Sequence, residues 1–177
     1  MTKSSAQIAA AKRDFVERLA VCSEEDGMPR IAGRLLAFLM VHDGAYSLDE
    51  LAEALQASKA SVSTNARLLE ERGVLLRGGS PGDRRDFYQI APAPWQNVIV
   101  NARRKVQKFK ETVDDTLQAL PASETGPRRR LREAALFYEF VMDDLRELQT
   151  RWADVLRAAE ESGLHEEAGA AKAKDRR

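Results

Sequence analysis

Short hydroxyl side chains and two adjacent arginines are the residues in this sequence whose types and spacing could do chemistry. Ser61, Ser63 and Thr64 lie within one short segment, and Arg84 and Arg85 follow further along the chain. Hydroxyl groups can donate or accept hydrogen bonds at base edges in the major groove of DNA. Arginine can enter a narrow minor groove, where the electrostatic potential is most negative. These residues therefore predict contacts with double-stranded DNA.

The hydroxyl side chains fall on the second of two predicted helices. A helix over 59–72 is expected to begin after a Ser58 cap and to end at Gly73, which can leave a helix with positive φ. At 100° per residue, Thr64 points away from the apolar Val62, and its neighbours on that side are small or polar. Such a face lets a helix backbone approach base edges closely.

The first of the two helices is predicted over 47–56, with Ser47 as its cap. Its apolar residues recur at helical spacing and its acidic residues face outward, so it is not expected to lie against phosphate. Strand-like runs at 74–77 and 86–90 flank a connection rich in turn residues, and Asp83 is placed to orient one guanidinium of that hairpin. The order helix, turn, helix and hairpin predicts a winged helix-turn-helix. Taken alone, the hairpin is more readily explained as an ordinary surface hairpin with solvated charges.

Four runs carry a resemblance to a known family: Gly27–Arg34, Leu51–Leu55, Ser61–Thr64 and Gly82–Tyr88. They resemble MarR-type transcriptional regulators, and they are most similar to the GbsR-like branch, over about 6–120. The resemblance implies a homodimeric bacterial repressor or activator that recognises a pseudo-palindromic site. The second helix of each subunit would enter a major groove, and each wing would reach a flanking minor groove.

The resemblance also assigns site residues. Groove contacts would fall on Lys59, Ser61, Ser63, Thr64 and Arg67, and wing contacts on Arg84 and Arg85. Asn65 departs from the family, because it stands near the buried edge of the helix where an aliphatic residue is common.

GbsR-like regulators are associated with quaternary ammonium compounds such as choline, so the resemblance implies a small-molecule effector. A fully alkylated cation has no hydrogen-bond donors and is bound by the faces of aromatic rings. The candidate cage residues are Tyr88, Trp95, Phe109, Tyr138 and Trp152. Most of them fall on apolar helix faces, so core packing explains them equally well.

The overall charge does not by itself indicate nucleic acid. The 177 residues are 44% hydrophobic and 32% charged, and their formal net charge is zero. From Ser58 to Arg85, however, six basic residues stand against three acidic ones. Attraction to DNA must come from this local asymmetry, so we expect that two copies of the motif are needed.

The expected fold is mainly α, with a small two-stranded β-wing and long C-terminal dimerisation helices. Residues 1–25 form a helix that contributes to dimerisation, 26–92 form the winged helix-turn-helix, and 93–162 form two long helices for dimerisation. The tail at 163–177 is expected to be disordered. Apolar seams of alternating threes and fours mark both long helices. The seams are Trp95, Ile99, Ala102, Val106, Phe109, Val113, Thr116 and Leu120, then Leu131, Ala134, Tyr138, Val141, Leu145, Leu148, Trp152, Val155 and Ala159.

Other classes of function are disfavoured. The single cysteine, Cys22, allows no intramolecular disulfide and is expected to pack on the apolar side of the first helix. The isolated histidines predict no metal site, and nothing predicts a cofactor or an enzyme. No membrane span or secretion signal is apparent, so the chain is expected in the cytoplasm. The alternative function is a winged-helix protein-interaction module in a chromosome-organising or regulatory complex.

Overall fold

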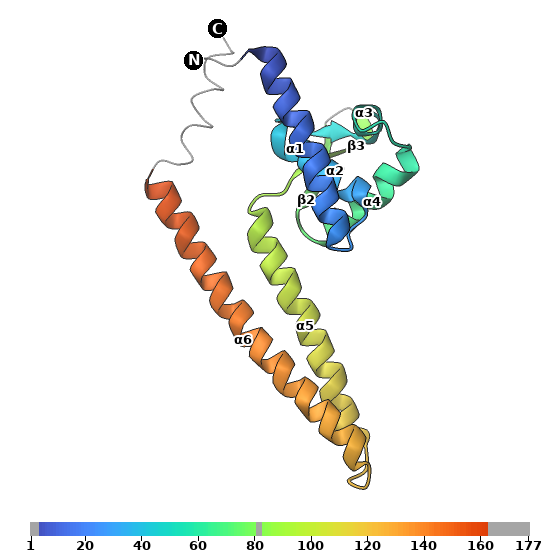
Figure 1. Ribbon diagram of the computed structural model, residues 1–177, viewed down its shortest axis with the longest axis vertical. Coiled ribbons are helices and arrows are strands. Elements are labelled where there is room, and N and C mark those ends of the chain that lie inside the picture. The colour runs from blue at the N-terminus through green and yellow to red at the C-terminus, as the bar shows by residue number, and fades with distance from the viewer. Residues whose placement is uncertain (1–3, 81–82, 163–177) are drawn as a thin grey trace. The chain divides into compact units, whose positions relative to one another are not determined.

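The computed structural model describes residues 4–80 and 83–162, which belong to two compact units, Met1–Val98 and Ile99–Arg177. The side chains of Ser80, Asp83 and Arg84 also lie outside this description. The elements are α1 Ser5–Glu25, α2 Arg30–Val41, β1 Tyr46–Ser47, α3 Leu48–Ala54, α4 Lys59–Glu71, β2 Leu75–Ser80, β3 Asp83–Ile90, α5 Pro94–Ala119 and α6 Thr125–Glu161 (Figure 1). The chain is mainly helical with one small antiparallel sheet, and it has a winged helix fold.

Local signals set the ends of the helix-turn-helix elements. Ser47 caps α3 in a capping box, in which its Oγ accepts from the Glu50 amide at 3.3 Å and its own amide donates to the Glu50 carboxylate at 2.7 Å. Gly73 follows α4 with a φ of 74°, as its position in the sequence predicts. Both helices begin at the predicted caps, and each ends within two residues of its predicted boundary.

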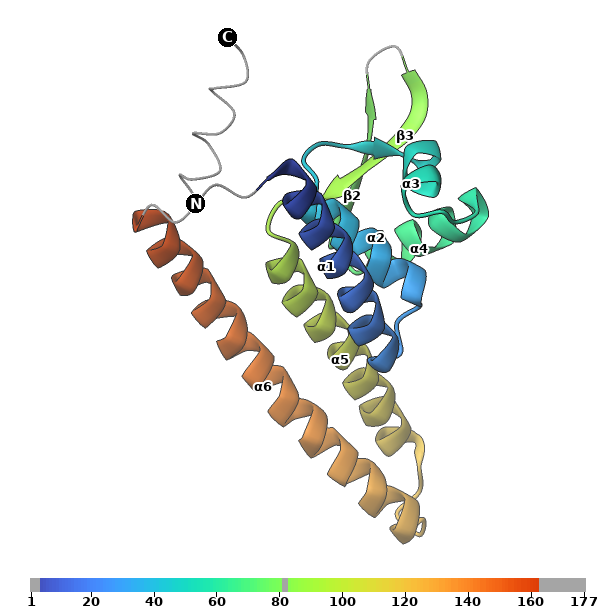
Figure 2. The ribbon, with the colours of Figure 1, turned by 45° about the horizontal axis from the view of Figure 1, so that its top comes forward.

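The sheet has the order β1-β3-β2, and β2 and β3 form the predicted hairpin. Its strands extend further than expected, because Gly78 and Gly79 pair with Phe87 and Asp86 instead of forming a turn. The strand β1 was not expected; it has two residues, and its Tyr46 pairs with Tyr88. In Figure 2 the hairpin projects from the helices of the first unit. We call residues 75–90 the wing.

The core of the first unit lies between α2, α3, α4 and the sheet. Its largest fully buried apolar residues are Leu35, Leu51, Leu55, Val62 and Leu69. Because these side chains come from α2 and from both helices of the motif, they fix α3 and α4 on a common support. Burying four leucines and a valine contributes roughly 1.5–3 kcal/mol for each side chain.

Helix α1 lies against α2 through small residues (Figure 1). Ala20 and Ser23 are buried in α1, and they face Gly33 of α2 so closely that a Cβ atom at Gly33 would lie 2.9 Å from the Ala20 Cα. The expectation that Cys22 is packed is wrong, since its side chain is exposed. The buried positions of α1 are Val16, Ala20 and Ser23, and Cys22 falls outside that row.

The second unit is an antiparallel pair of long helices (Figures 1 and 2). Phe109 stacks on Tyr138 with ring centroids 5.7 Å apart, and Arg103 Nη1 donates to Gln149 Oε1 at 3.2 Å. Arg128 Nη1 donates to the Leu117 carbonyl near the end of α5 at 2.6 Å. Within the described part of α5 and α6, no residue is buried. The pair therefore lacks a closed core of its own.

The predicted seams follow the observed inner faces only in part. Leu148 and Val155 are 44% and 54% exposed, and Gln149 and Leu156 are half-buried instead. Trp95, Phe109 and Thr116 are also exposed. A strict alternation of threes and fours averages 3.5 residues per turn, whereas a straight α-helix has 3.6, so the contacting face drifts away from a heptad seam.

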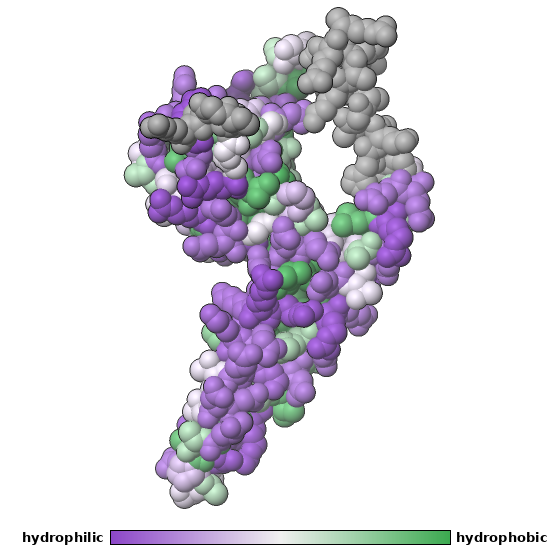
Figure 3. Space-filling view, turned by 180° about the vertical axis from the view of Figure 1, so that it is seen from behind, coloured by the Kyte–Doolittle hydropathy of each residue, from purple (hydrophilic) through white to green (hydrophobic). Residues whose placement is uncertain are grey.

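A second apolar face remains uncovered on α6. Leu136, Phe137 and Phe140 are 68%, 60% and 64% exposed. The space-filling view in Figure 3 shows apolar side chains at the surface of the long helices among polar ones. Large exposed aromatic side chains in neighbouring positions are typical of an interaction surface.

Candidate nucleic-acid interface

The second helix of the motif, α4, has one face in the core and one face exposed. Val62, Asn65, Ala66 and Leu69 are buried, while Thr64 is exposed. The predicted groove residues Lys59 and Arg67 are exposed as well, and Ser61 and Ser63 are half-buried at its edges. We call Lys59, Ser61, Ser63, Thr64 and Arg67 the outer face of α4. All five lie on a single helix, where Thr64 and Arg67 face away from the buried residues and Ser61 and Ser63 lie at the flanks of that face.

The start of α4 is fixed by a side-chain cap. Ser58 Oγ accepts from the Ser61 amide at 3.2 Å, which satisfies one of the free donors at the helix N-terminus. Asn65 lies at the buried edge, as its position predicts, and its Nδ2 donates to the Ser61 carbonyl at 2.8 Å. This hydrogen bond satisfies an amide that would otherwise be costly to bury. Asn65 therefore belongs to the packing of α4 rather than to its outer face.

Lys59 of the outer face is paired with an acidic residue of α3. Its Nζ forms an ion pair with Oδ1 of Asp49 in α3, and both side chains are at least half exposed. The outward-facing acid of α3 gave no indication of this contact in the sequence. The turn between the two helices brings the first residue of α4 beside the first turn of α3. Any phosphate that approaches Lys59 must therefore compete with a carboxylate.

The wing contains a second ion pair that the sequence analysis missed. Arg77 Nη2 lies 2.7 Å from Asp86 Oδ2 across the β2–β3 pair, and the Asp86 carboxylate raises the pKa of Arg77. Arg85 is exposed, with its guanidinium carbon 5.3 Å from the centroid of the Phe87 ring. The predicted roles of Asp83 and Arg84 fall on side chains outside the described part of the chain. Only the register of β2 and β3, which the sequence does not give, shows that Arg77 lies beside Asp86.

The five aromatic residues of the proposed cage do not share one environment. Tyr88 is buried in the sheet at 2% exposure, and burial raises the pKa of its phenol. Phe109 and Tyr138 stack with their planes 13° apart, so their facing surfaces contact each other and do not enclose a cation. Trp95 is 43% exposed, and Trp152 is half-buried. Phe109 and Tyr138 are the two cage candidates whose rings stack.

Two further observations concern other classes of site. In the described ranges, no group of three His, Cys, Asp or Glu side chains is arranged to hold a metal ion. Across the same ranges, no helix combines the length and the apolar character needed to cross a membrane.

Comparisons with known proteins match this chain to winged-helix transcriptional regulators. A model of the MarR family matches residues 26–86, and a model described as an MmpR5-like MarR family transcriptional regulator matches residues 93–161. The HTH-type transcriptional regulator MmpR5 of Mycobacterium tuberculosis is 36% identical over 121 residues, which are 68% of this chain and 73% of the relative. The putative HTH-type transcriptional regulator YvaV of Bacillus subtilis is 29% identical over 92 residues, which are 52% of each chain.

A solved structure shares most of the architecture. It is the crystal structure of a transcriptional regulator that is 31% identical and has a TM-score of 0.74. The match covers 81% of this chain and 99% of the other. The MmpR5-like family model spans residues 93–161, so the long helices belong to a region shared with the family.

Proposed function

Because the chain belongs to the MarR family of winged-helix transcriptional regulators, we propose that it binds a pseudo-palindromic DNA site as a homodimer and so regulates transcription. The outer face of α4 in each subunit enters a major groove, and the wing reaches the flanking minor groove with Arg84 and Arg85. The observation that carries the proposal is the outer face itself. Its Lys59, Thr64 and Arg67 are exposed, its serine hydroxyl groups lie at the edges, and the opposite side of the helix is fixed in the core.

The second unit supports the homodimer. Its two helices bury no residue within the described chain, and α6 exposes Phe137 and Phe140. A second copy that covers these side chains removes apolar surface from water at about 25 cal/mol per Å². It also places two copies of α4 and of the wing on one duplex, which multiplies otherwise modest phosphate contacts.

The expectation of a small-molecule effector comes from the family resemblance alone. The GbsR-like branch, the quaternary ammonium effector that it implies and the repressor role remain predictions. The ring pair of Phe109 and Tyr138 gives an aromatic cage little support, because the two rings occupy each other's faces.

The proposal is tested by titrating purified protein into labelled duplex DNA from upstream of its own gene and following fluorescence anisotropy. We expect two protomers per duplex by sedimentation, and a binding constant whose logarithm falls linearly with the logarithm of salt concentration. The slope should be about −0.9 for each phosphate contact. An unrelated duplex of equal length is the control.

Two outcomes would contradict the proposal. Equal affinity for the upstream and the unrelated duplex across the salt range would remove sequence recognition at that site. A complete lack of DNA binding, with the fold intact by circular dichroism, would favour the interaction module instead.

Replacing Asp49 by asparagine should raise the affinity for unrelated DNA. The change releases Lys59 from its ion pair and removes a negative charge beside the outer face. We expect a gain of roughly fivefold or more, since one freed cation at about 4 Å from a phosphate is worth on the order of 1 kcal/mol in water. Anisotropy with the unrelated duplex measures it.

The matched control is Glu53→Gln, which removes one exposed acid from the same helix and leaves the pair of Asp49 and Lys59 intact. If both variants gain affinity equally, long-range charge explains the effect. The ion pair would then have no specific role in discrimination.

A further inference from the structure

The turn between α3 and α4 has an unusual backbone and lies beside a cavity. Gln56 has a φ of 49°, in the left-handed region that favours glycine, and α3 ends at the cap residue Leu55. The carbonyl groups at the end of a helix have no partner within the helix and must find one elsewhere. A cavity of about 550 Å³ opens beside this turn, lined by Val16, Arg34, Phe38, His42, Leu55 and Gln56 among others.

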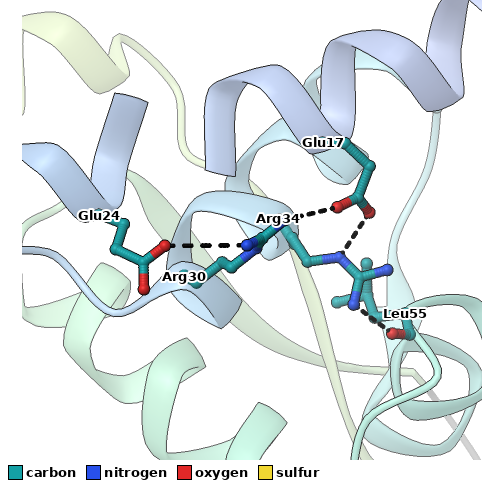
Figure 4. A network of polar contacts seen from close by, with 5 residues as sticks. All are labelled: Glu17, Glu24, Arg30, Arg34 and Leu55. Atoms are coloured by element: carbon teal, nitrogen blue, oxygen red, sulfur yellow. Dashed lines mark hydrogen bonds and ion pairs between the residues drawn. The ribbon is translucent and has the colours of Figure 1, made fainter. Parts of the chain in front are cut away.

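Arg34 of α2 supplies the missing partner. Its Nη1 donates to the Leu55 carbonyl at 2.8 Å, and its side chain is 23% exposed (Figure 4). The hydrogen bond adds to the packing of the buried Leu55 side chain and holds the backbone of the turn on the side that faces the cavity. A partly buried hydrogen bond from a charged donor is stronger than a neutral one.

Arg34 is itself oriented by α1. Its Nε lies 2.9 Å from Glu17 Oε1, an ion-pair contact without the alignment of a hydrogen bond. Arg30 Nη2 lies 3.5 Å from the other oxygen of Glu17, and Arg30 Nη1 lies 3.9 Å from Glu24 (Figure 4). One guanidinium therefore contacts both α1 and the end of α3, and these contacts lie within one compact unit.

We propose that Arg34 is a positioning residue for DNA recognition, which fixes the α3–α4 turn and hence the direction of α4. Glu17 makes that position depend on α1, so a displacement of α1 is transmitted to the outer face of α4 through Arg34. The inference rests on the proposed function, because the direction of α4 matters for base contacts. Arg34 contacts no DNA itself in this arrangement.

The experiment compares Arg34→Ala and Arg34→Lys with the parent chain, using the upstream duplex. Arg34→Ala should lower the affinity by roughly tenfold, since a hydrogen bond to a charged group is typically worth this much. The slope of affinity against salt should stay unchanged, because no phosphate contact is lost. Arg34→Lys keeps a charged donor and should recover part of the affinity. Amide hydrogen exchange at 56–58 should accelerate in Arg34→Ala.

Two results would overturn the role of Arg34. A slope smaller by about one for each arginine removed would make Arg34 a direct phosphate contact. Parental affinity in Arg34→Ala would show that the turn holds its position without the hydrogen bond. If the parent protein binds no DNA, the proposed function fails, and hydrogen exchange at 56–58 still tests whether Arg34 holds the turn.

Glu17→Gln tests the link to α1 and keeps the proposal testable if Arg34→Ala does not fold. The control is Asp14→Asn, which removes another exposed carboxylate of α1 that pairs with Arg18. Glu17→Gln should lower DNA affinity and Asp14→Asn should not. In the double variant with Arg34→Ala, the Glu17 change should add nothing, because its effect passes through Arg34. Additive losses, or equal effects of Glu17→Gln and Asp14→Asn, would break the proposed link.

Discussion

Replacement of Thr64 by glutamate is expected to lower the affinity for the upstream duplex by roughly 100-fold or more. Thr64 lies exposed in the middle of the outer face of α4, so the change removes a hydroxyl and directs a carboxylate toward DNA. Loss of one base contact costs about 1–3 kcal/mol, and a homodimer loses it twice. The added charges also face phosphate. Anisotropy with the upstream duplex measures the loss.

The same substitution at Thr112, an exposed threonine of α5, is the control for charge and for helix propensity. Both variants should unfold at a temperature close to that of the parent, because neither side chain is buried. If Thr64→Glu binds as tightly as the parent, then α4 does not enter a groove through this face. The assignment of the outer face would then be wrong, even with the fold correct.

Replacement of Gly33 by alanine is expected to lower the free energy of unfolding by about 2 kcal/mol, within the range for overpacking a close contact. The added Cβ would lie 2.6 Å from Ser23 Oγ and 2.9 Å from the Cα of Ala20. Rotation of the serine hydroxyl relieves only the Oγ contact, because the Ser23 Cβ would lie 2.7 Å away, and the backbone of α1 cannot yield without moving the whole helix. Urea denaturation followed by circular dichroism gives the difference.

Alanine in a helix interior is normally favoured over glycine by about 1 kcal/mol, so the expected sign is opposite to that of helix propensity. Gly126→Ala is the matched control, because the nearest atom to a Cβ there is Arg130 Nη1 at 3.7 Å. It should leave the stability unchanged or raise it. A Gly33→Ala variant as stable as the parent would mean that α1 can shift on α2 without cost.

The parts of the fold that local chemistry determines were predictable from the sequence. Ser47, Ser58 and Gly73 mark helix ends through hydrogen bonds and φ preferences that need only neighbouring residues. The strand at Tyr46 was not predictable in this way, because two residues become a strand only through pairing with a distant partner. The predicted seam was wrong at Leu148 because a straight helix drifts away from a strict heptad spacing, and the sequence pattern alone does not show where the contact with the partner helix ends.

The same distinction holds in the candidate site, where positions set by helical geometry were predictable and contacts with other elements were not. Helical geometry alone placed Thr64 opposite Val62, and the exposure of Thr64 in the structure agrees. The partners of Lys59 and Arg77 come from other elements, so spacing along the chain could not reveal them. Arg34 belongs to one of the runs that resemble the family, but its contact could not be predicted, because its partner is a backbone carbonyl in a different helix.

The paired cations of the interface have a consequence for how the protein finds its site. Because Lys59 and Arg77 each lie beside a carboxylate and the formal net charge is zero, a regulator of the kind proposed would bind arbitrary sequence weakly. Its molecules would then spend little time on unrelated DNA, and more of them would be free to reach the recognised site.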